Sequence, residues 1–174
     1  MLLLYLIFLL PILVVRGNDL ATVLQQAAGV YKNAGSNKLN ADLSKTVLIT
    51  AANIAYLPFF HNFKCFLDRL GFKALMFSMD EKIHAELGKV GGDVIFSYYW
   101  NSGSGHATEG VALFATPQFH TITNKKKEGV LDVLRLGYDV IFADIDIALL
   151  RDPLPYLLWN NVDYVHSVNW ICPQ

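Results

Sequence analysis

Residues 137–157, GYDVIFADIDIALLRDPLPYL, place two aspartates directly after a short apolar run. The run Val140–Ala143 predicts a buried strand, and Asp144 and Asp146 follow it. In extended chain, side chains two residues apart point to the same side, roughly 6–7 Å apart. Two carboxylates so placed repel each other and lose hydration unless a cation or hydrogen-bond donors accompany them. The pattern therefore predicts a site for a hard divalent cation, which binds carboxylates and substrate phosphates.

A simpler interpretation of the two aspartates stays open at this point. One carboxylate caps the next turn and the other is solvated, and a bare Asp-x-Asp sequence often occurs by chance. The position of the motif, directly after a strand that reads as buried, favours the cation site over this interpretation.

The sequence before this stretch alternates short apolar runs with helical patterns. Apolar runs predict strands at Thr46–Thr50, Phe72–Met79, Asp93–Trp100 and Val140–Ala143, with a further candidate at Asp163–Ser167. Helical spacing predicts helices at Asp19–Tyr31, Leu57–Leu70, Glu81–Lys89 and Lys126–Leu136. A segment from Glu109 to Ile122 is expected to be helical in part, with a break or kink at Pro117.

Strands that alternate with helices of about ten residues predict an α/β fold, a mostly parallel sheet with helices on both faces. Ligands of such sheets bind outside the carboxyl ends of the strands. The polar residues expected there are Thr50 and Asn53 after the first strand, Asp80 after the second, and Asp144 and Asp146 after the fourth. Asp80 is also placed to cap the helix that starts at Glu81.

The chain has 174 residues, enough for one domain of ordinary size. Its 14 basic and 15 acidic side chains give a net charge of −1, which excludes nucleic-acid binding through bulk positive charge. We expect residues 18–45 to form a helix and a linker, and residues 46–174 to form the main domain.

The N-terminal residues Met1–Val15 carry no charged side chain. As a helix this run rises only about 22 Å, less than the roughly 30 Å hydrocarbon core of a bilayer. It therefore predicts a signal peptide or signal anchor in residues 1–17, with a buried N-terminal element as the alternative. The expected location is the secretory pathway, as a Golgi lumenal or membrane protein or a secreted one.

The stretch from Gly137 to Leu157 resembles the nucleotide-diphospho-sugar transferase family that includes plant cell-wall xylosyl- and arabinosyltransferases. The shared features are a Gly-Tyr pair before an apolar strand, the Asp-x-Asp motif and an Arg-Asp-Pro turn. Weaker matches are Thr50, Asn53, Asn62, Asp80 and a lysine eleven residues before Gly137, namely Lys126, with Lys127 as the near alternative. The resemblance implies a GT-A fold with a Rossmann-like sheet, a nucleotide-diphospho-sugar donor, Mn²⁺ or Mg²⁺, and a glycan or glycoprotein acceptor.

By the same resemblance, Thr50 and Asn53 are expected to contact the nucleoside, and Asp80 to belong to the donor site. Asp144 is expected to meet the ribose or the metal, and Asp146 to bind the metal that bridges the diphosphate. Lys126 is expected to face the leaving diphosphate.

The family's domain continues past the point at which this sequence ends, so the fold is expected to be incomplete at its C-terminus, with weak transfer activity. Two alternatives remain open. One is a secreted module that binds a nucleotide sugar without turnover. The other is a phosphatase of the haloacid-dehalogenase type, in which a strand followed by Asp-x-Asp supplies the nucleophile and the acid.

Overall fold

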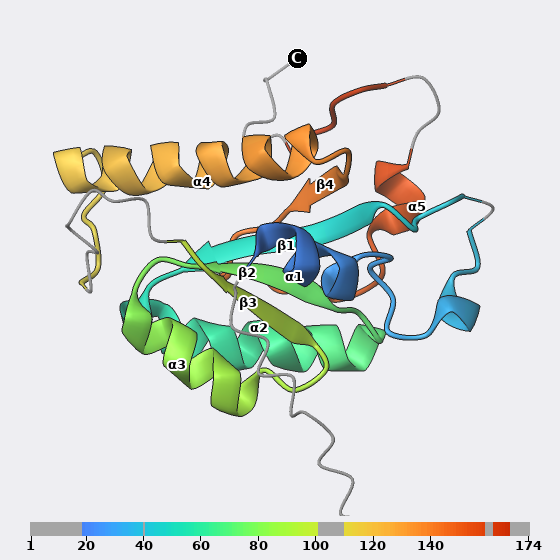
Figure 1. Ribbon diagram of the computed structural model, residues 1–174, viewed down its shortest axis with the longest axis horizontal. Coiled ribbons are helices and arrows are strands. Elements are labelled where there is room, and N and C mark those ends of the chain that lie inside the picture. Colours follow the sequence, from blue (N-terminus) through green and yellow to red (C-terminus); the bar gives the residue numbers. More distant parts are fainter. Residues whose placement is uncertain (1–18, 40, 101–109, 159–161, 168–174) are drawn as a thin grey trace, which may run out of the picture.

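The computed structural model describes residues 19–39, 41–100, 110–158 and 162–167, and its centre is a parallel β-sheet (Figure 1). The sheet has four strands in the order β3-β2-β1-β4, and every neighbouring pair is parallel. The strands are β1 (Thr46–Ala52), β2 (Ala74–Ser78), β3 (Ile95–Tyr99) and β4 (Asp139–Phe142). The predicted α/β fold with a parallel sheet is confirmed.

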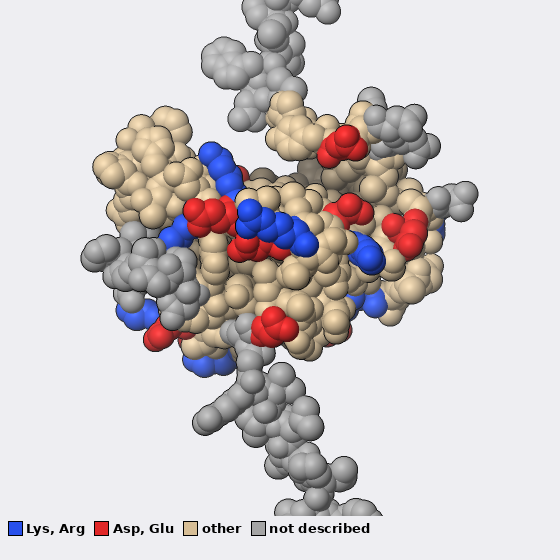
Figure 2. All heavy atoms as spheres, turned by 45° about the horizontal axis from the view of Figure 1, so that its top comes forward, with Lys and Arg blue, Asp and Glu red and all other residues tan. Residues whose placement is uncertain are grey.

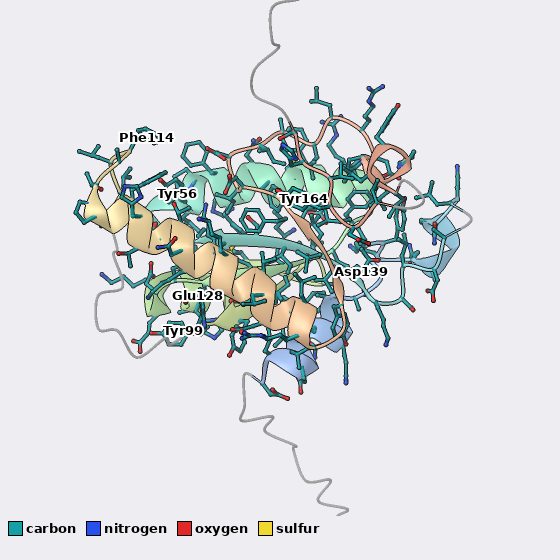
Figure 3. The ribbon with its side chains drawn as sticks, turned by 90° about the horizontal axis from the view of Figure 1, so that it is seen from above. Tyr56, Tyr99, Phe114, Glu128, Asp139 and Tyr164 are labelled. Atoms are coloured by element: carbon teal, nitrogen blue, oxygen red, sulfur yellow. The ribbon has the colours of Figure 1, made fainter. Side chains whose placement is uncertain are left out.

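Helices cover both faces of the sheet. They are α1 (Leu20–Ala27), α2 (Leu57–Leu70), α3 (Glu81–Val90), α4 (Pro117–Arg135) and the short α5 (Leu154–Leu157), with single 3₁₀ turns η1 (Ala34–Ser36) and η2 (Ile54–Tyr56). In Figure 1, α2 and α3 lie below the sheet and α4 lies above it. From above, α4 crosses the sheet diagonally (Figure 3). The alternation of strand and crossover helix produces this layering, because parallel neighbours need a connection that returns over one face.

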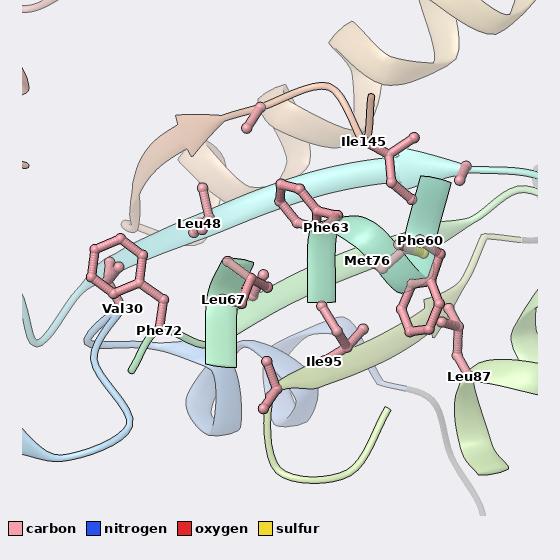
Figure 4. Close-up of a cluster of buried hydrophobic side chains, with 14 of the residues drawn as sticks. Val30, Leu48, Phe60, Phe63, Leu67, Phe72, Met76, Leu87, Ile95 and Ile145 are labelled. Carbon is pink, nitrogen blue, oxygen red and sulfur yellow. The ribbon is translucent and has the colours of Figure 1, made fainter. Parts of the chain in front are cut away.

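Two apolar clusters, one on each face, hold the layers together. Side chains alternate along β1, so Val47 and Ile49 pack with α1 and α4 while Leu48 faces α2 and α3. The cluster on the face that α2 and α3 cover includes Phe60, Phe63 and Leu67, which lie on one side of α2 (Figure 4). Full burial of each such side chain stabilises the fold by about 1.5–3 kcal/mol. All seven residues of β1 are buried, and β1 lies between β2 and β4 in the interior of the sheet.

Local signals fix the ends of α2 and α3 where the sequence predicts them. α2 ends at Gly71, whose φ of +68° lies in the left-handed region that glycine adopts without strain. α3 begins after Asp80, whose carboxylate accepts the backbone N–H of Ile83.

The prediction of a break at Pro117 is wrong. Pro117 begins α4, which runs without interruption for 19 residues. Backbone N–H groups in the first turn of a helix have no acceptor within the helix, so proline, which lacks an N–H, fits at this position. Further along a helix, proline would break or kink it. Thr116 precedes it as the cap, and its hydroxyl accepts the backbone N–H of Phe119 at 3.2 Å.

Two strand predictions also need correction. β4 is an edge strand and only partly covered, with 39% of Phe142 exposed, so it is not fully buried. Asp163–Ser167 is not a strand: residues 162–167 are exposed and lie outside the sheet. An apolar alternation becomes a strand only where a neighbour offers backbone partners and a surface to pack on.

The predicted signal segment, residues 1–17, lies outside the described residues. Within the part of the chain that the structure describes, no helix combines the length and the apolar character needed to cross a membrane. Figure 2 shows Lys and Arg side chains interspersed with Asp and Glu on one face of the molecule, in keeping with the balanced charge of the sequence.

Candidate functional site

A cavity of about 430 Å³ lies at the carboxyl ends of β1 and β4, beside α4. Its polar lining includes Asn53 from the end of β1, Lys126 from α4, and Asp144 and Asp146 from the segment after β4. The structure thus brings together four of the six site residues predicted from the sequence. They meet because the carboxyl ends of parallel strands share one edge of the sheet, where α/β proteins bind ligands.

The two aspartates lie on a turn, not on extended chain. β4 ends at Phe142, and the N–H of Ile147 donates to the carbonyl oxygen of Asp144 at 3.4 Å. Ala143 and Ile145 are buried in the core, while Asp144 and Asp146 are exposed. The sequence argument from extended geometry is therefore wrong in detail, but alternate burial still leaves both aspartates lining the cavity.

Lys126 forms an ion pair with the first aspartate. Its Nζ lies 2.6 Å from Oδ1 of Asp144 and 5.9 Å from the centre of the Phe142 ring. The Lys126 side chain is 28% exposed and that of Asp144 is 53% exposed. α4 can lie close to the sheet because Gly129 faces Phe77, where a Cβ would stand only 3.3 Å from the ring.

Asp146 differs from Asp144 in its surroundings. Its carboxylate makes no hydrogen bond or ion pair with a described residue, and it is exposed at the cavity. The cavity therefore holds one carboxylate engaged by a lysine and a second carboxylate open to a ligand.

Asn53, which lines the cavity, is almost fully buried. Its Oδ1 accepts the N–H of Ala55 at 3.2 Å, and its Nδ2 donates to the carbonyl oxygen of Gly110 at 2.9 Å. The side chain thereby joins the start of η2 to the segment that leads into α4. It fixes one wall of the cavity and lines it at the same time.

Asp80 and Thr50 do not line the cavity. Asp80 is 1% exposed, and its two oxygens accept the backbone N–H groups of Ile83 at 2.8 Å and Ile54 at 2.7 Å. It therefore ties α3 to η2. Both of its carboxylate oxygens thus accept backbone N–H groups, and its place in the donor site stays a prediction.

Thr50 is 0% exposed, inside β1 and not beyond its end. Its hydroxyl has no hydrogen-bond partner among the described residues. β1 continues to Ala52, so Thr50 lies inside the strand and its side chain does not line the cavity. The nucleoside contact that the resemblance implies for Thr50 stays a prediction.

An apolar wall, which the sequence analysis did not predict, completes the cavity. It includes Tyr56, Met79, Phe142, and Phe119 and Ile122 of α4. Phe119, Ile122, Thr123 and Lys126 follow the i, i+3, i+4, i+7 spacing of one helical face. Had the sequence been read as one continuous helix from Pro117, this spacing would have predicted Phe119, Ile122 and Thr123 on the same face as Lys126.

The two aspartates by themselves form an incomplete set of ligands for a divalent cation. Among the described residues, no group of three or more His, Cys, Asp and Glu side chains is placed to bind a metal. Two exposed carboxylates nevertheless fit Mg²⁺ or Mn²⁺, which commonly binds one or two carboxylates together with substrate phosphates and water. A diphosphate would supply the missing oxygens, and the apolar wall suits the ring of a base or sugar.

Comparison with known proteins agrees with this geometry. Residues 72–171, more than half of the chain, match the family model described as nucleotide-diphospho-sugar transferase. No solved structure matches the chain.

Similar proteins carry names of sugar transferases. They include the beta-arabinofuranosyltransferase RAY1 of Arabidopsis thaliana, 29% identical over 68% of this chain and 22% of that protein. UDP-D-xylose:L-fucose alpha-1,3-D-xylosyltransferase 3 of the same plant is 28% identical over 66% of this chain and 29% of that protein. UDP-galactose:fucoside alpha-3-galactosyltransferase of Dictyostelium discoideum is 32% identical over 67% of this chain and 16% of that protein.

The chain thus spans less than a third of the length of these relatives. The matched residues contain β2, β3, α4, β4 and the Asp-x-Asp turn, so the match includes Lys126, Asp144 and Asp146 but not the part of the cavity lining that comes from β1 and η2. The match also decides against the phosphatase alternative. The chain belongs to the nucleotide-diphospho-sugar transferase family.

Proposed function

We propose that this chain binds the nucleotide-sugar donor of a metal-dependent glycosyltransferase. The donor is a nucleoside diphosphate sugar, and UDP is the nucleotide to test first because two similar proteins are named for UDP-xylose and UDP-galactose. The observation that carries the proposal is the meeting of Lys126, Asp144 and Asp146 in one cavity at the carboxyl edge of the sheet.

The proposed roles follow from the charge that develops when the sugar leaves. Breaking the bond between sugar and diphosphate leaves negative charge on the diphosphate, and fixed positive charge nearby stabilises it. Asp144 and Asp146 would hold Mn²⁺ or Mg²⁺, which supplies part of that charge. Lys126 would donate hydrogen bonds from its ammonium group to a diphosphate oxygen.

The remaining lining would orient the donor. The Asn53 side chain and the ring of Tyr56 lie at the end of the cavity formed by β1 and η2, and Phe119 and Ile122 form the α4 wall. These groups exclude water from one side of the donor and limit its orientation. Orientation of the anomeric carbon supplies a large share of the rate in such transfers.

The acceptor is proposed to be a glycan or a glycoprotein, reached in the secretory pathway. Two similar proteins have fucose or fucoside in their names. The uncharged run Met1–Val15 supports entry into the secretory pathway.

The location can be tested by expressing a tagged chain in plant cells. It should be found in Golgi membranes or the medium, and a purely cytosolic distribution would contradict entry into the secretory pathway.

Calorimetry tests the donor site directly. UDP should bind in the presence of Mn²⁺, and binding should fall at least tenfold with EDTA or in Asp146→Asn, since charge-assisted contacts are lost. Asp139→Asn is the matched control, because Asp139 is exposed at the opposite end of β4 (Figure 3). Equal UDP binding with EDTA and in Asp146→Asn would contradict the metal-dependent site.

Turnover separates an enzyme from a binding module. Release of UDP from UDP-xylose or UDP-galactose, with or without an added fucoside, should depend on Mn²⁺ and on Asp146. Donor binding without any release of UDP by the chain would favour the non-catalytic alternative.

A further inference from the structure

The ion pair between Lys126 and Asp144 involves two groups with different proposed partners. Nζ of Lys126 lies 2.6 Å from Oδ1 of Asp144, at hydrogen-bond distance. The carboxylate of Asp144 is proposed to bind a cation, and the ammonium of Lys126 a diphosphate. In the arrangement that the structure shows, Asp144 therefore holds the ammonium that would bind the diphosphate, and Lys126 holds the carboxylate that would bind the cation.

Packing limits where the Lys126 ammonium can go. The side chain leaves α4, which Gly129 seats against Phe77, and the ammonium lies over the Phe142 ring. Only 28% of the side chain is exposed. The ammonium contacts Asp144 at the edge of the same cavity, so an anion that enters the cavity would compete with Asp144 for it.

We propose that Lys126 couples the binding of the divalent cation to the binding of the diphosphate. This inference rests on the proposed donor site. Without the nucleotide, Lys126 holds Asp144 and weakens its affinity for the cation. The diphosphate draws the ammonium away from Asp144, which frees the carboxylate for the cation. By linkage, the cation must strengthen nucleotide binding by the same factor as the nucleotide strengthens cation binding.

The coupling predicts effects of opposite sign from one substitution. In Lys126→Gln, Mn²⁺ alone should bind about two- to fivefold tighter, the range expected when a partly exposed ion pair is removed. UDP in the presence of Mn²⁺ should bind about tenfold weaker, because a charge-assisted hydrogen bond to the diphosphate is lost. A residue with only a structural role would weaken both or neither.

The experiment measures Mn²⁺ alone, and Mn²⁺ with saturating UDP, by calorimetry on the whole chain. In the wild type, UDP should raise the affinity for Mn²⁺, and in Lys126→Gln this increase should shrink. Lys126→Arg keeps the positive charge and the reach to both partners, so it should preserve most of the coupling. Circular dichroism confirms that each variant is folded.

Lys127→Gln is the matched control. Lys127 is the next residue, lines the same cavity and makes no ion pair with a described residue. Its removal lowers the positive charge near the aspartates by the same amount without opening an ion pair, so Mn²⁺ alone should gain little. An equal gain in Lys127→Gln would show that general electrostatics explains the effect and would overturn the proposal.

The remaining outcomes are also distinguishable. Unchanged Mn²⁺ affinity in Lys126→Gln, with UDP and Mn²⁺ both binding the wild type, overturns the coupling and leaves the proposed function intact. Failure of the folded wild type to bind either probe overturns the proposed function and the coupling with it.

Discussion

The hydroxyl of Tyr31 donates a hydrogen bond to the carboxylate of Asp152, a residue 121 positions further along the chain. Tyr31 is buried and meets Phe72 edge to face, with ring centres 5.1 Å apart. The other oxygen of Asp152 accepts the N–H of Leu154, which is fully buried. The segment that follows the Asp-x-Asp turn is thus tied to the segment that follows α1.

Tyr31→Phe should lower the free energy of unfolding by about 1–2 kcal/mol, because a partly buried hydrogen bond to a charged group is lost. Urea denaturation measures the change. Tyr164→Phe is the control: Tyr164 is exposed, so the same chemical change should stay within about 0.5 kcal/mol. A loss no larger than that of the control would show that the Tyr31–Asp152 bond adds nothing to stability.

The same hydrogen bond predicts a pH dependence. Burial and the bond to Asp152 raise the pKa of Tyr31 above its ordinary value of 10.0. The folded state therefore holds this proton more tightly than the unfolded state, and the resulting stability is fully present below pH 10 and declines at higher pH. The difference between wild type and Tyr31→Phe should shrink above about pH 10 in urea titrations, and a difference that grows there would contradict the assignment.

Asp80→Asn should destabilise the fold by about 2–3 kcal/mol, because a buried backbone N–H of Ile54 or Ile83 then lacks an acceptor. Thermal unfolding and UDP titration together decide its role. Glu81→Gln, at an exposed neighbour, should cost less than about 1 kcal/mol. An unchanged melting temperature with UDP binding lost would instead support the direct donor contact predicted from the sequence.

Gly91→Ala should cost about 1–3 kcal/mol through overpacking. A Cβ there would lie 2.7 Å from the carbonyl oxygens of both Ile95 and Leu87, and neither backbone group can move away freely. Gly88→Ala is the matched control, since it lies within α3 with nothing within 4 Å of an added Cβ. That change should stabilise the protein by about 0.5–1 kcal/mol. Equal melting temperatures of the two variants would contradict the steric argument.

The elements that the sequence predicted well have strong local signals. α2 was predicted with its observed bounds, because its apolar period is clear and Gly71 ends it. The break predicted at Pro117 was wrong since proline both ends and begins helices, and Thr116 alone did not decide between the two. The strand predicted at Asp163–Ser167 was wrong because pairing depends on neighbours that a local pattern does not reveal.

The candidate site was predictable where it depends on topology. Asn53, Asp144 and Asp146 lie near one another because parallel strands end at a common edge. Thr50 was expected at the end of the first strand, whereas β1 continues to Ala52, so Thr50 lies inside the sheet and not in the cavity lining. Their roles in binding a nucleotide sugar stay predictions, which the titrations above would test.

Thr50→Val should stabilise the fold by about 1 kcal/mol and leave UDP binding unchanged. The Thr50 hydroxyl is fully buried without a hydrogen-bond partner among the described residues, and such a group costs about 1–3 kcal/mol relative to an apolar one of the same shape. Valine keeps the branched shape that β1 packs around, so the substitution removes the cost without leaving a cavity.

The control is Thr46→Val. Thr46 is the other buried threonine of β1, but its hydroxyl is not a buried group without a hydrogen-bond partner. It should give no comparable gain. Urea denaturation and calorimetry with UDP and Mn²⁺ measure both effects. Lower stability in Thr50→Val would mean that the hydroxyl has a hydrogen-bond partner, and weaker UDP binding by a folded variant would support the nucleoside contact that the resemblance implies.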